Sequence, residues 1–301
     1  MRFGVNIPNY GPTASPDTML ASVRHAEDLG LDVAMLSDHI AVTPDVAAQY
    51  PAPFYEPLTA LAWLAGRTER IRLGTTVLIM PYRDPLLTAR VTANLDRYSA
   101  GRLVLGVGIG WAEQEFAALK VDYAERGRIT DEYLAALRTL WTEDIATFEG
   151  THVSFRDVQT APRPSQSPHP PIWIGGNSPA AIRRAVRHGD TWHPLGVTTA
   201  WLEKQGLPAL RQAAEQAGRP TPTVALRTPL RITTTPATDA DRLPGEGTIA
   251  QIEADLAALA TLGIENILLD TRYGDAERLR PPTQDQADLE SIAHLLPPHH
   301  P

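Results

Sequence analysis

The chain has 301 residues, of which 43% are hydrophobic and 21% charged, with no cysteine and a net charge of −8 at pH 7. A chain of this length buries a large core without cross-links, and the lack of cysteine excludes disulfide scaffolds, thiolate metal sites and cysteine nucleophiles. The acidic balance argues against nucleic-acid binding, which needs a basic face. No apolar run approaches the roughly 20 residues of a membrane span, and residues 1–11 lack signal-peptide features. We therefore expect a cytoplasmic protein that binds neither nucleic acid nor membrane.

Short apolar runs alternate along the chain with segments whose apolar residues recur at helical spacing. The first run ends at a loop over residues 8–11, and Ser15-Pro16 then begins a helix, with serine as N-cap and proline in the first turn. The pattern predicts strands at 2–7, 33–36, 71–78, 103–107, 172–174, 190–195, 224–232 and 264–269. It predicts helices at 15–30, 57–67, 84–101, 131–141, 178–189, 199–217, 248–262 and 286–295, and a small hairpin within 147–155.

This order corresponds to eight strand–helix units, which imply a parallel sheet. Eight units in about 300 residues fit a closed (β/α)8 barrel of the TIM type better than an open doubly wound sheet, which is the alternative. We predict one α/β domain over residues 1–301, with insertion loops near 40–56, 145–170 and 233–247.

In such a barrel the active site forms from the loops after the carboxyl ends of the strands. His39 follows the second strand, where an imidazole can exchange a proton near neutral pH, or can hydrogen-bond Asp38 as a purely structural group. His193, at the end of the sixth strand, is the second candidate. The histidine spacing contains no HExxH or other metal signature, so we predict no metal.

Two glycine-rich loops are candidate ligand sites. The segment Gly108-Ile109-Gly110 lets backbone approach a ligand, although Trp111 stands where a dinucleotide fingerprint needs glycine, and the alternative is a tight turn. The segment Gly175-Gly176-Asn177-Ser178 precedes a helix whose free N–H groups would suit a phosphate, and the alternative is an ordinary capped loop. Three arginines, Arg83, Arg231 and Arg272, follow strands and could hold an anionic substrate or lie on the surface.

The chain resembles the luciferase-like monooxygenase superfamily, in particular its branch of oxidoreductases that depend on the deazaflavin coenzyme F420. The resemblance extends from Phe3 to Asp270. The motifs that carry it are 37–39 (SDH), 73–78 (LGTTVL), 101–111 (GRLVLGVGIGW) with Glu115-Phe116, 125–128 (ERGR), 170–178 (PPIWIGGNS) and 189–194 (GDTWHP).

The resemblance implies that F420, or alternatively FMN, binds in the barrel mouth. It implies a cofactor phosphate at Gly176, Asn177 and Ser178, beside Gly175, a ring against a cis peptide bond at Thr76-Val77, and Gly108 to Gly110 near the ring or its tail. It further implies that His39 holds or deprotonates a substrate hydroxyl, and that the chain forms a homodimer through helices near 58–67 and 86–98.

The sequence departs from the sugar-phosphate dehydrogenases of this branch at Trp111, where those relatives carry an acid. Glu113 or Glu115 could supply the carboxylate, or both could lie in the first turn of a helix. The chain has lysine only at Lys120 and Lys204, which also weakens a sugar-phosphate substrate. We expect Asn6, Trp111, His193 and Arg231 to border the substrate pocket.

The leading functional hypothesis is an F420-dependent oxidoreductase that moves hydride to or from a small organic substrate. The second is an FMN-dependent monooxygenase that uses oxygen and receives reduced flavin, with a separate F420 or flavin reductase as partner in either case. A deazaflavin lacks N5 and does not favour oxygen activation, so the two hypotheses differ in chemistry. A barrel that carries or senses a flavin without turnover is a third.

Overall fold

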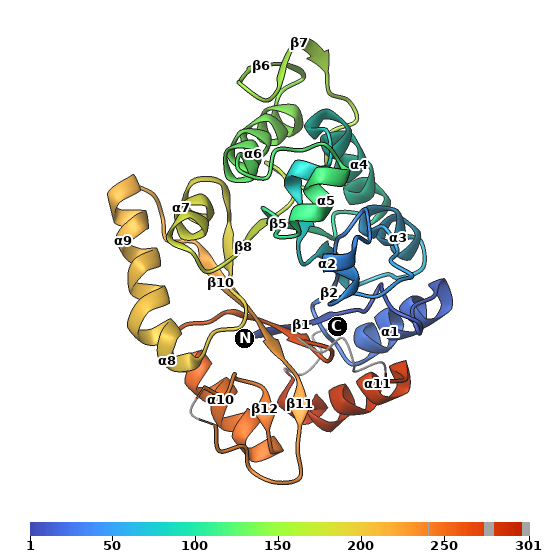
Figure 1. Ribbon diagram of the computed structural model, residues 1–301, viewed down its shortest axis with the longest axis vertical. Helices are drawn as coiled ribbons and strands as arrows, with labels where there is room; N and C mark the ends of the chain where they lie inside the picture. The colour runs from blue at the N-terminus through green and yellow to red at the C-terminus, as the bar shows by residue number, and fades with distance from the viewer. Residues whose placement is uncertain (240, 274–279, 297–301) are drawn as a thin grey trace.

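The computed structural model describes residues 1–239, 241–273 and 280–296. Its barrel strands are β1 (Arg2–Asn6), β2 (Val33–Leu36), β3 (Arg72–Thr75), β4 (Leu78–Ile79), β5 (Leu103–Gly108), β8 (Ile172–Gly175), β9 (Thr191–His193), β10 (Thr223–Pro229) and β13 (Asn266–Asp270). Within these residues the strands are parallel and lie in the order β3-β2-β1-β13-β10-β9-β8-β5-β4 (Figure 1). β3 and β4 together occupy one of the eight strand positions of the barrel, which we call staves. β3 also pairs with β5, which closes the ring. The predicted barrel is therefore confirmed, and the open sheet is excluded.

The third stave is interrupted where the sequence predicted one continuous strand at 71–78. β3 ends at Thr75 and β4 begins at Leu78, and the peptide bond between Thr76 and Val77 is cis, as the resemblance implied. Both halves pair with β5. A Cβ atom at Gly106 of β5 would collide with the carbonyl oxygen of Thr75, so only glycine fits beside the interruption.

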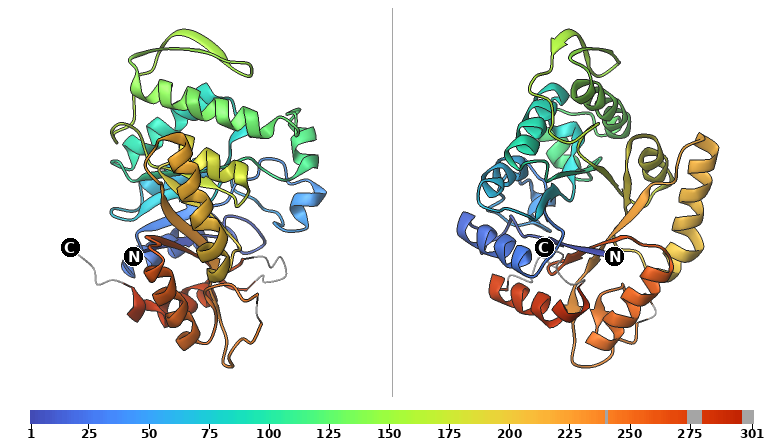
Figure 2. Two further views of the ribbon diagram at one scale, coloured as in Figure 1. Left: turned by 90° about the vertical axis from the view of Figure 1, so that its left-hand side faces the viewer. Right: turned by 180° about the vertical axis from the view of Figure 1, so that it is seen from behind.

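The helices surround the barrel as an outer ring (Figures 1 and 2). Several begin with the caps that the sequence predicts: Ser15 forms a capping box with Thr18, and Ser178 accepts the backbone N–H of Ala181. The bounds are α1 Pro16–Asp28, α2 Pro44–Ala47, α3 Pro57–Ala65, α4 Pro85–Tyr98, α5 Glu113–Ala118, α6 Arg126–Thr142, α7 Pro179–His188, α8 Thr199–Trp201, α9 Leu207–Ala217, α10 Ile249–Thr261 and α11 Pro282–Ser291, with single turns at η1 Met80–Tyr82 and η3 Ala293–Leu295 and a π-helical segment η2 Leu202–Gly206.

The core has two layers because successive strand residues point to opposite faces of the sheet. In β2, Ala34 and Leu36 belong to the large cluster between strands and helices, whereas Val33 and Met35 point into the barrel. The barrel interior also contains Val104, Trp173, Ala225 and Leu268, all buried. The interior is therefore filled at this level, and open space is left at the mouth.

Several predicted boundaries are corrected by the structure. The helix expected at 131–141 begins at Arg126, because its first turn is polar and carries no apolar periodicity. The strand expected at 224–232 ends at Pro229; Arg231 donates its backbone N–H to Gly245 (2.9 Å), and β11 (Arg231–Ile232) pairs with β12 (Glu246–Gly247). The helix expected at 286–295 is α11 followed by η3.

The predicted hairpin is confirmed as β6 (Ile145–Glu149) and β7 (Ser154–Gln159), which pair antiparallel. It projects beyond α4 and α6 (Figure 1). The N-terminus lies on one face of the barrel, and α2 and α5 lie on the other (Figure 2, left). In the three described ranges, no helix is long and apolar enough to cross a membrane, and no cluster of His, Asp or Glu side chains is arranged to hold a metal ion.

Candidate active site

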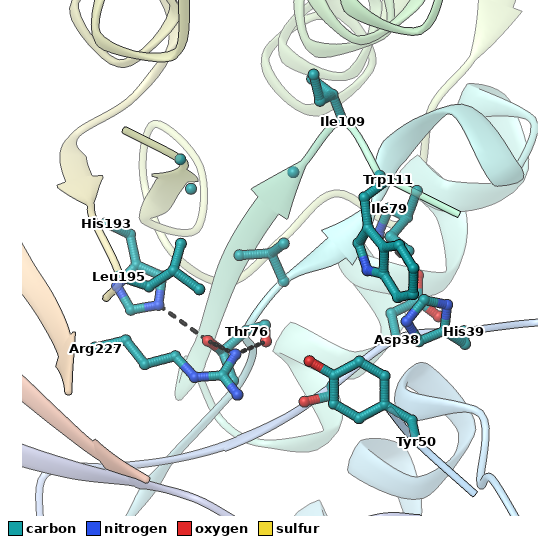
Figure 3. Close-up of a pocket in the computed structure, with 16 residues that line it drawn as sticks. Asp38, His39, Tyr50, Thr76, Ile79, Ile109, Trp111, His193, Leu195 and Arg227 are labelled. Atoms are coloured by element: carbon teal, nitrogen blue, oxygen red, sulfur yellow. Dashed lines mark hydrogen bonds between the residues drawn. The ribbon is translucent and has the colours of Figure 1, made fainter. Parts of the chain in front are cut away.

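A pocket of about 300 Å³ opens at the carboxyl ends of the strands, the face of a barrel on which catalytic loops meet. Figure 3 shows His39, Tyr50 and Trp111 on one side and His193 and Arg227 on the other. The lining residues are Ser37, Asp38, His39, Tyr50, Thr76, Val77, Ile79, Gly108, Ile109, Gly110, Trp111, Gly175, Gly176, His193, Leu195 and Arg227. The pocket thus joins residues from six staves and one long loop into one site.

His39 is held by a buried carboxylate. Its Nδ1 atom lies 2.6 Å from Oε2 of Glu115, while Oε1 of Glu115 accepts the backbone N–H groups of Ile40 (2.6 Å) and Ala41 (2.9 Å). Burial opposes ionisation of Glu115, but the hydrogen bond and charge of His39 and the two amides outweigh it, so the pKa of Glu115 lies below its ordinary value. With Nδ1 donating to the carboxylate, Nε2 of His39 has no hydrogen-bond partner among the described residues and is available at the pocket.

Asp38 does not orient His39. Oδ2 of Asp38 accepts the backbone N–H of Ile79 (2.8 Å), and both carboxylate oxygens accept from Arg83 (2.7 and 2.8 Å). Arg83 also donates to Glu56 (2.8 Å). The Arg83 guanidinium is therefore fully engaged between two carboxylates, and it does not serve as the predicted anion holder.

The opposite side of the pocket is a fixed polar network. Nδ1 of His193 lies 2.6 Å from the carbonyl oxygen of Ala225, and Nε2 lies 3.0 Å from Oγ1 of Thr76. Burial lowers the pKa of His193 to about 4. The neutral ring therefore donates from Nδ1 and accepts the Thr76 hydroxyl at Nε2, so both nitrogens are engaged. Arg227 donates to the Thr76 carbonyl (2.8 Å) and pairs with buried Asp270 (2.6 and 3.0 Å; Figure 3).

The side chain of Val77 depends on glycines of two neighbouring staves. A Cβ atom at Gly108 would collide with Val77 Cγ2, and one at Gly175 would lie 3.0 Å from Cγ1. Glycine at both positions lets the interrupted stave bring Val77 to the pocket wall. The glycines that the sequence suggested as ligand contacts therefore also shape the wall itself.

The N-terminus of α7 borders the pocket beside Gly175 and Gly176. The Asn177 side chain bridges to Leu195, donating to its carbonyl (2.6 Å) and accepting its N–H (3.1 Å). Among the described residues, the backbone N–H groups of Asn177 and Ser178 have no protein acceptor. These groups, with the positive end of the helix dipole, suit an anion.

Most of the site residues predicted from the sequence line the pocket, but several do not. Asn6 is fully buried at the end of β1, with both side-chain polar atoms unpartnered among the described residues, and Arg231 pairs with Glu246 (2.8 Å); neither lines the pocket. Arg272 pairs with Asp285 (3.0 Å) away from it. Asn177 and Ser178 stand at its edge. The lining residues that were predicted are His39, Thr76, Val77, Gly108, Ile109, Gly110, Trp111, Gly175, Gly176 and His193.

Sequence reasoning missed Arg227 and left Glu115 as one of two alternatives. Arg227 lies within a predicted strand. The one signal for a site was its place near the carboxyl end of that strand, on the face that points into the barrel. Glu113 and Glu115 both lie in the first turn of α5, as considered above, but Glu113 is exposed and Glu115 is buried against His39. Helical spacing cannot tell the two apart without the position of α5.

The chain is similar in sequence to two enzymes whose cofactors are known. It is 34% identical over 210 residues to an F420-dependent glucose-6-phosphate dehydrogenase of Kineococcus radiotolerans, covering 68% of this chain and 60% of that protein. It is 32% identical over 154 residues to an FMNH2-dependent dimethylsulfone monooxygenase of Pseudomonas putida, covering 50% and 42%. The matches thus span less than two thirds of either relative.

Among solved structures, the chain is similar to the monooxygenase RslO1 of Streptomyces bottropensis, with a TM-score of 0.78, 25% identity and 98% of each chain covered. The family model of the luciferase-like monooxygenases matches residues 1–283. The chain belongs to the luciferase-like monooxygenase family.

Proposed function

We propose that the protein is an F420-dependent oxidoreductase that transfers hydride between the deazaflavin and a small organic substrate. The observation that carries the proposal is the His39–Glu115 pair, which leaves one imidazole nitrogen available at the pocket. The match to the F420-dependent relative, which covers more of the chain than the match to the FMNH2-dependent one, supports the choice of cofactor.

In this function His39 acts as the proton acceptor. A substrate alcohol would give its hydroxyl proton to Nε2 of His39, and the bound cofactor would supply the acceptor for the hydride on carbon, so that the product is a carbonyl compound. The carboxylate of Glu115, 2.6 Å from Nδ1, stabilises the positive charge that the ring acquires. In the reverse direction the protonated ring returns the proton to the carbonyl oxygen.

The residues around the pocket fit a phosphorylated tricyclic cofactor. The free N–H groups at Asn177 and Ser178 would hold the phosphate, Thr76, Val77 and Gly108 to Gly110 would border the ring, and the bound group would supply the hydride acceptor. His193 serves as a positioning residue, because it fixes the Thr76 hydroxyl and its two ring nitrogens are both engaged by protein groups.

The second candidate is an FMN-dependent monooxygenase that uses reduced flavin and oxygen. It is favoured by the similarity to the FMNH2-dependent relative and to the monooxygenase RslO1. The same pocket and the same anion site would serve FMN, so the cofactor itself is the discriminating observation.

Titration with each cofactor tests the proposal. Purified protein in matched buffer and salt is titrated with F420 and with FMN while fluorescence is followed. We expect saturable binding of F420 that is tighter than binding of FMN. Tight FMN binding without F420 binding would overturn the proposal in favour of the monooxygenase.

The substitution Glu115→Gln tests the positioning of His39. The glutamine amide would present a donor to Nδ1, so the ring would carry its proton on Nε2 and could no longer accept one there. We expect kcat to fall by about 10²–10⁴-fold while F420 affinity changes little. Glu113→Gln, on the exposed face of the same helix, is the matched control and should keep full activity.

Glu115 also links stability to pH. Because its pKa is lower in the folded than in the unfolded state, the ionised Glu115 carboxylate, with the hydrogen bonds it accepts, stabilises the fold at neutral pH. That contribution is lost as the pH falls from the ordinary glutamate value, about 4.3, through the folded value. Urea unfolding at pH 7 and pH 3 should therefore show a smaller pH dependence for Glu115→Gln than for the wild type. An unchanged dependence would contradict the role of the pair.

The remaining expectations belong to the same proposal. We propose a cytoplasmic homodimer that packs through α3 and α4 and works with a separate F420 or flavin reductase. We also propose, as the sequence predicts, one domain over residues 1–301 with insertion loops near 40–56, 145–170 and 233–247.

A further inference from the structure

The end of the pocket that holds His39 is walled by aromatic rings. Ring centroids of Tyr50 and Trp111 lie 5.3 and 5.7 Å from that of His39 and 6.5 Å from each other. Phe54, which does not line the pocket, also contacts the His39 ring, with 5.5 Å between ring centroids. A substrate beside Nε2 of His39 would therefore contact mainly aromatic surface (Figure 3).

A second layer of aromatic packing fixes these rings. Tyr10 contacts Tyr50 at 5.0 Å and Phe54 at 5.6 Å between ring centroids. Tyr10 is buried, and burial raises the pKa of Tyr50, so the Tyr50 hydroxyl stays a neutral hydrogen-bonding group. The wall is thus preorganised for an apolar molecule.

No described cation is free to bind an anionic substrate here. Arg227 is the one Lys or Arg among the described residues that line the pocket, and its charge is matched by Asp270 at 2.6 Å. Behind the wall, Arg83 is shared by Asp38 and Glu56. Glu115 adds a negative charge behind His39.

The anion site at the N-terminus of α7 lies away from this end. Asn177 is bonded to Leu195, on the side of the pocket where His193 and Arg227 stand, opposite His39 (Figure 3). Among the described residues of the aromatic wall, three polar side-chain atoms have no hydrogen-bond partner and remain for a substrate: Nε2 of His39, the hydroxyl of Tyr50 and the indole N–H of Trp111. Each matches a single hydroxyl or carbonyl oxygen.

We propose that the substrate is a small uncharged alcohol or carbonyl compound of largely hydrocarbon character, and that phosphate esters are excluded. The proposal rests on the redox function of the same pocket. The reaction is the proton and hydride transfer of the proposed function, with the substrate oxygen next to Nε2 of His39. A phosphate group at this end would place a dianion beside Glu115 and Asp38 with no unmatched cation, at a large desolvation cost. The pocket of about 300 Å³ is at the lower end of ligand sites, and because the cofactor ring would share it, the space left limits the substrate to a small molecule.

Binding of a matched pair of ligands tests the proposal. Cyclohexanol and cyclohexyl phosphate share one ring and differ in charge. Each ligand is titrated calorimetrically into protein that has been saturated with F420, or with FMN if only FMN binds. The bound cofactor then occupies the anion site at the N-terminus of α7. We expect cyclohexanol to bind at least 100-fold more tightly than cyclohexyl phosphate. Equal or tighter binding of the phosphate ester, or no binding of cyclohexanol, would overturn the proposal.

A charge variant sharpens the test. Trp111→Lys places a cation on the rim of the aromatic wall and should tighten cyclohexyl phosphate binding by at least tenfold, more so at low salt. Ile145→Lys, at an exposed apolar position on the β6–β7 hairpin, adds the same charge elsewhere and should leave the affinity unchanged. An equal effect of both variants would contradict a local charge deficit.

With F420 bound, turnover separates this proposal from the proposed function. Cofactor reduction by cyclohexanol and not by glucose 6-phosphate would support both. Reduction by glucose 6-phosphate with a higher kcat/KM would retain the F420 function and reject the neutral substrate. FMN binding without F420 binding would reject the proposed function, while the calorimetric comparison would still decide the substrate class.

Discussion

Replacing His39 with alanine is expected to lower kcat by about 10²–10⁴-fold, the usual contribution of a positioned general base. The substrate oxygen then has no proton acceptor at the position of Nε2, while the residues proposed to hold the cofactor are untouched. Steady-state kinetics and fluorescence titration of F420 are the measurements. Full turnover by the alanine variant would remove His39 from the mechanism.

His39→Asn is the companion variant, because alanine leaves the buried Glu115 carboxylate without its partner. The asparagine amide can still donate to that carboxylate but has no equivalent of Nε2. We therefore expect His39→Asn to fold with nearly wild-type stability and to remain as inactive as His39→Ala. Recovery of activity in His39→Asn would show that the hydrogen bond to Glu115, and not proton transfer, is what the reaction needs.

Replacing Arg227 with methionine is expected to destabilise the fold by about 3–5 kcal/mol, because the buried Asp270 carboxylate loses the cation that neutralises it. The change also removes the donor to the Thr76 carbonyl at the interrupted stave. Urea unfolding at pH 7 measures the effect on stability. The same variant should bind cofactor more weakly, because Arg227 and Thr76 both line the pocket.

Arg231→Met is the matched control for this prediction. Arg231 pairs with Glu246 at 2.8 Å at a half-exposed position, where an ion pair contributes less than about 1 kcal/mol. The double variant Arg227→Met/Asp270→Asn should recover part of the stability, because the carboxylate charge is then gone. A loss in Arg227→Met no larger than in Arg231→Met would show that the buried pair contributes little.

The barrel was predictable because the determinants of its elements are local. Alternation of short apolar runs with amphipathic segments predicts the strand–helix units, and caps such as Ser15 and Ser178 set helix starts through contacts three residues apart. The same local rules place His39 and the glycine loops at strand ends, and hence at the barrel mouth. These local rules do not predict the break between β3 and β4 within residues 71–78, because that break depends on how Thr75 and Val77 fit against the glycines of β5.

The partners of the charged groups could not be predicted from the sequence. His39 pairs with Glu115, 76 residues further on, and Arg227 contacts Thr76 across 151 residues. Arg83 and Arg272 follow strands as predicted, and Arg231 lies in β11 just after β10, yet each is paired with a carboxylate. Arg227 was overlooked inside a strand. The sequence shows the residue type of all four arginines and their positions relative to the strands. It does not show which carboxylate lies beside each of them in the fold.

The sequence by itself therefore determined the elements, their parallel order, the family resemblance and the position of His39 at a strand end, since these follow from short-range patterns. Only the tertiary structure decided which carboxylate holds His39, which arginine reaches the pocket and which charges cancel. The physical reason is that closing the barrel brings distant loops within hydrogen-bond distance, and those contacts fix protonation and charge at the site.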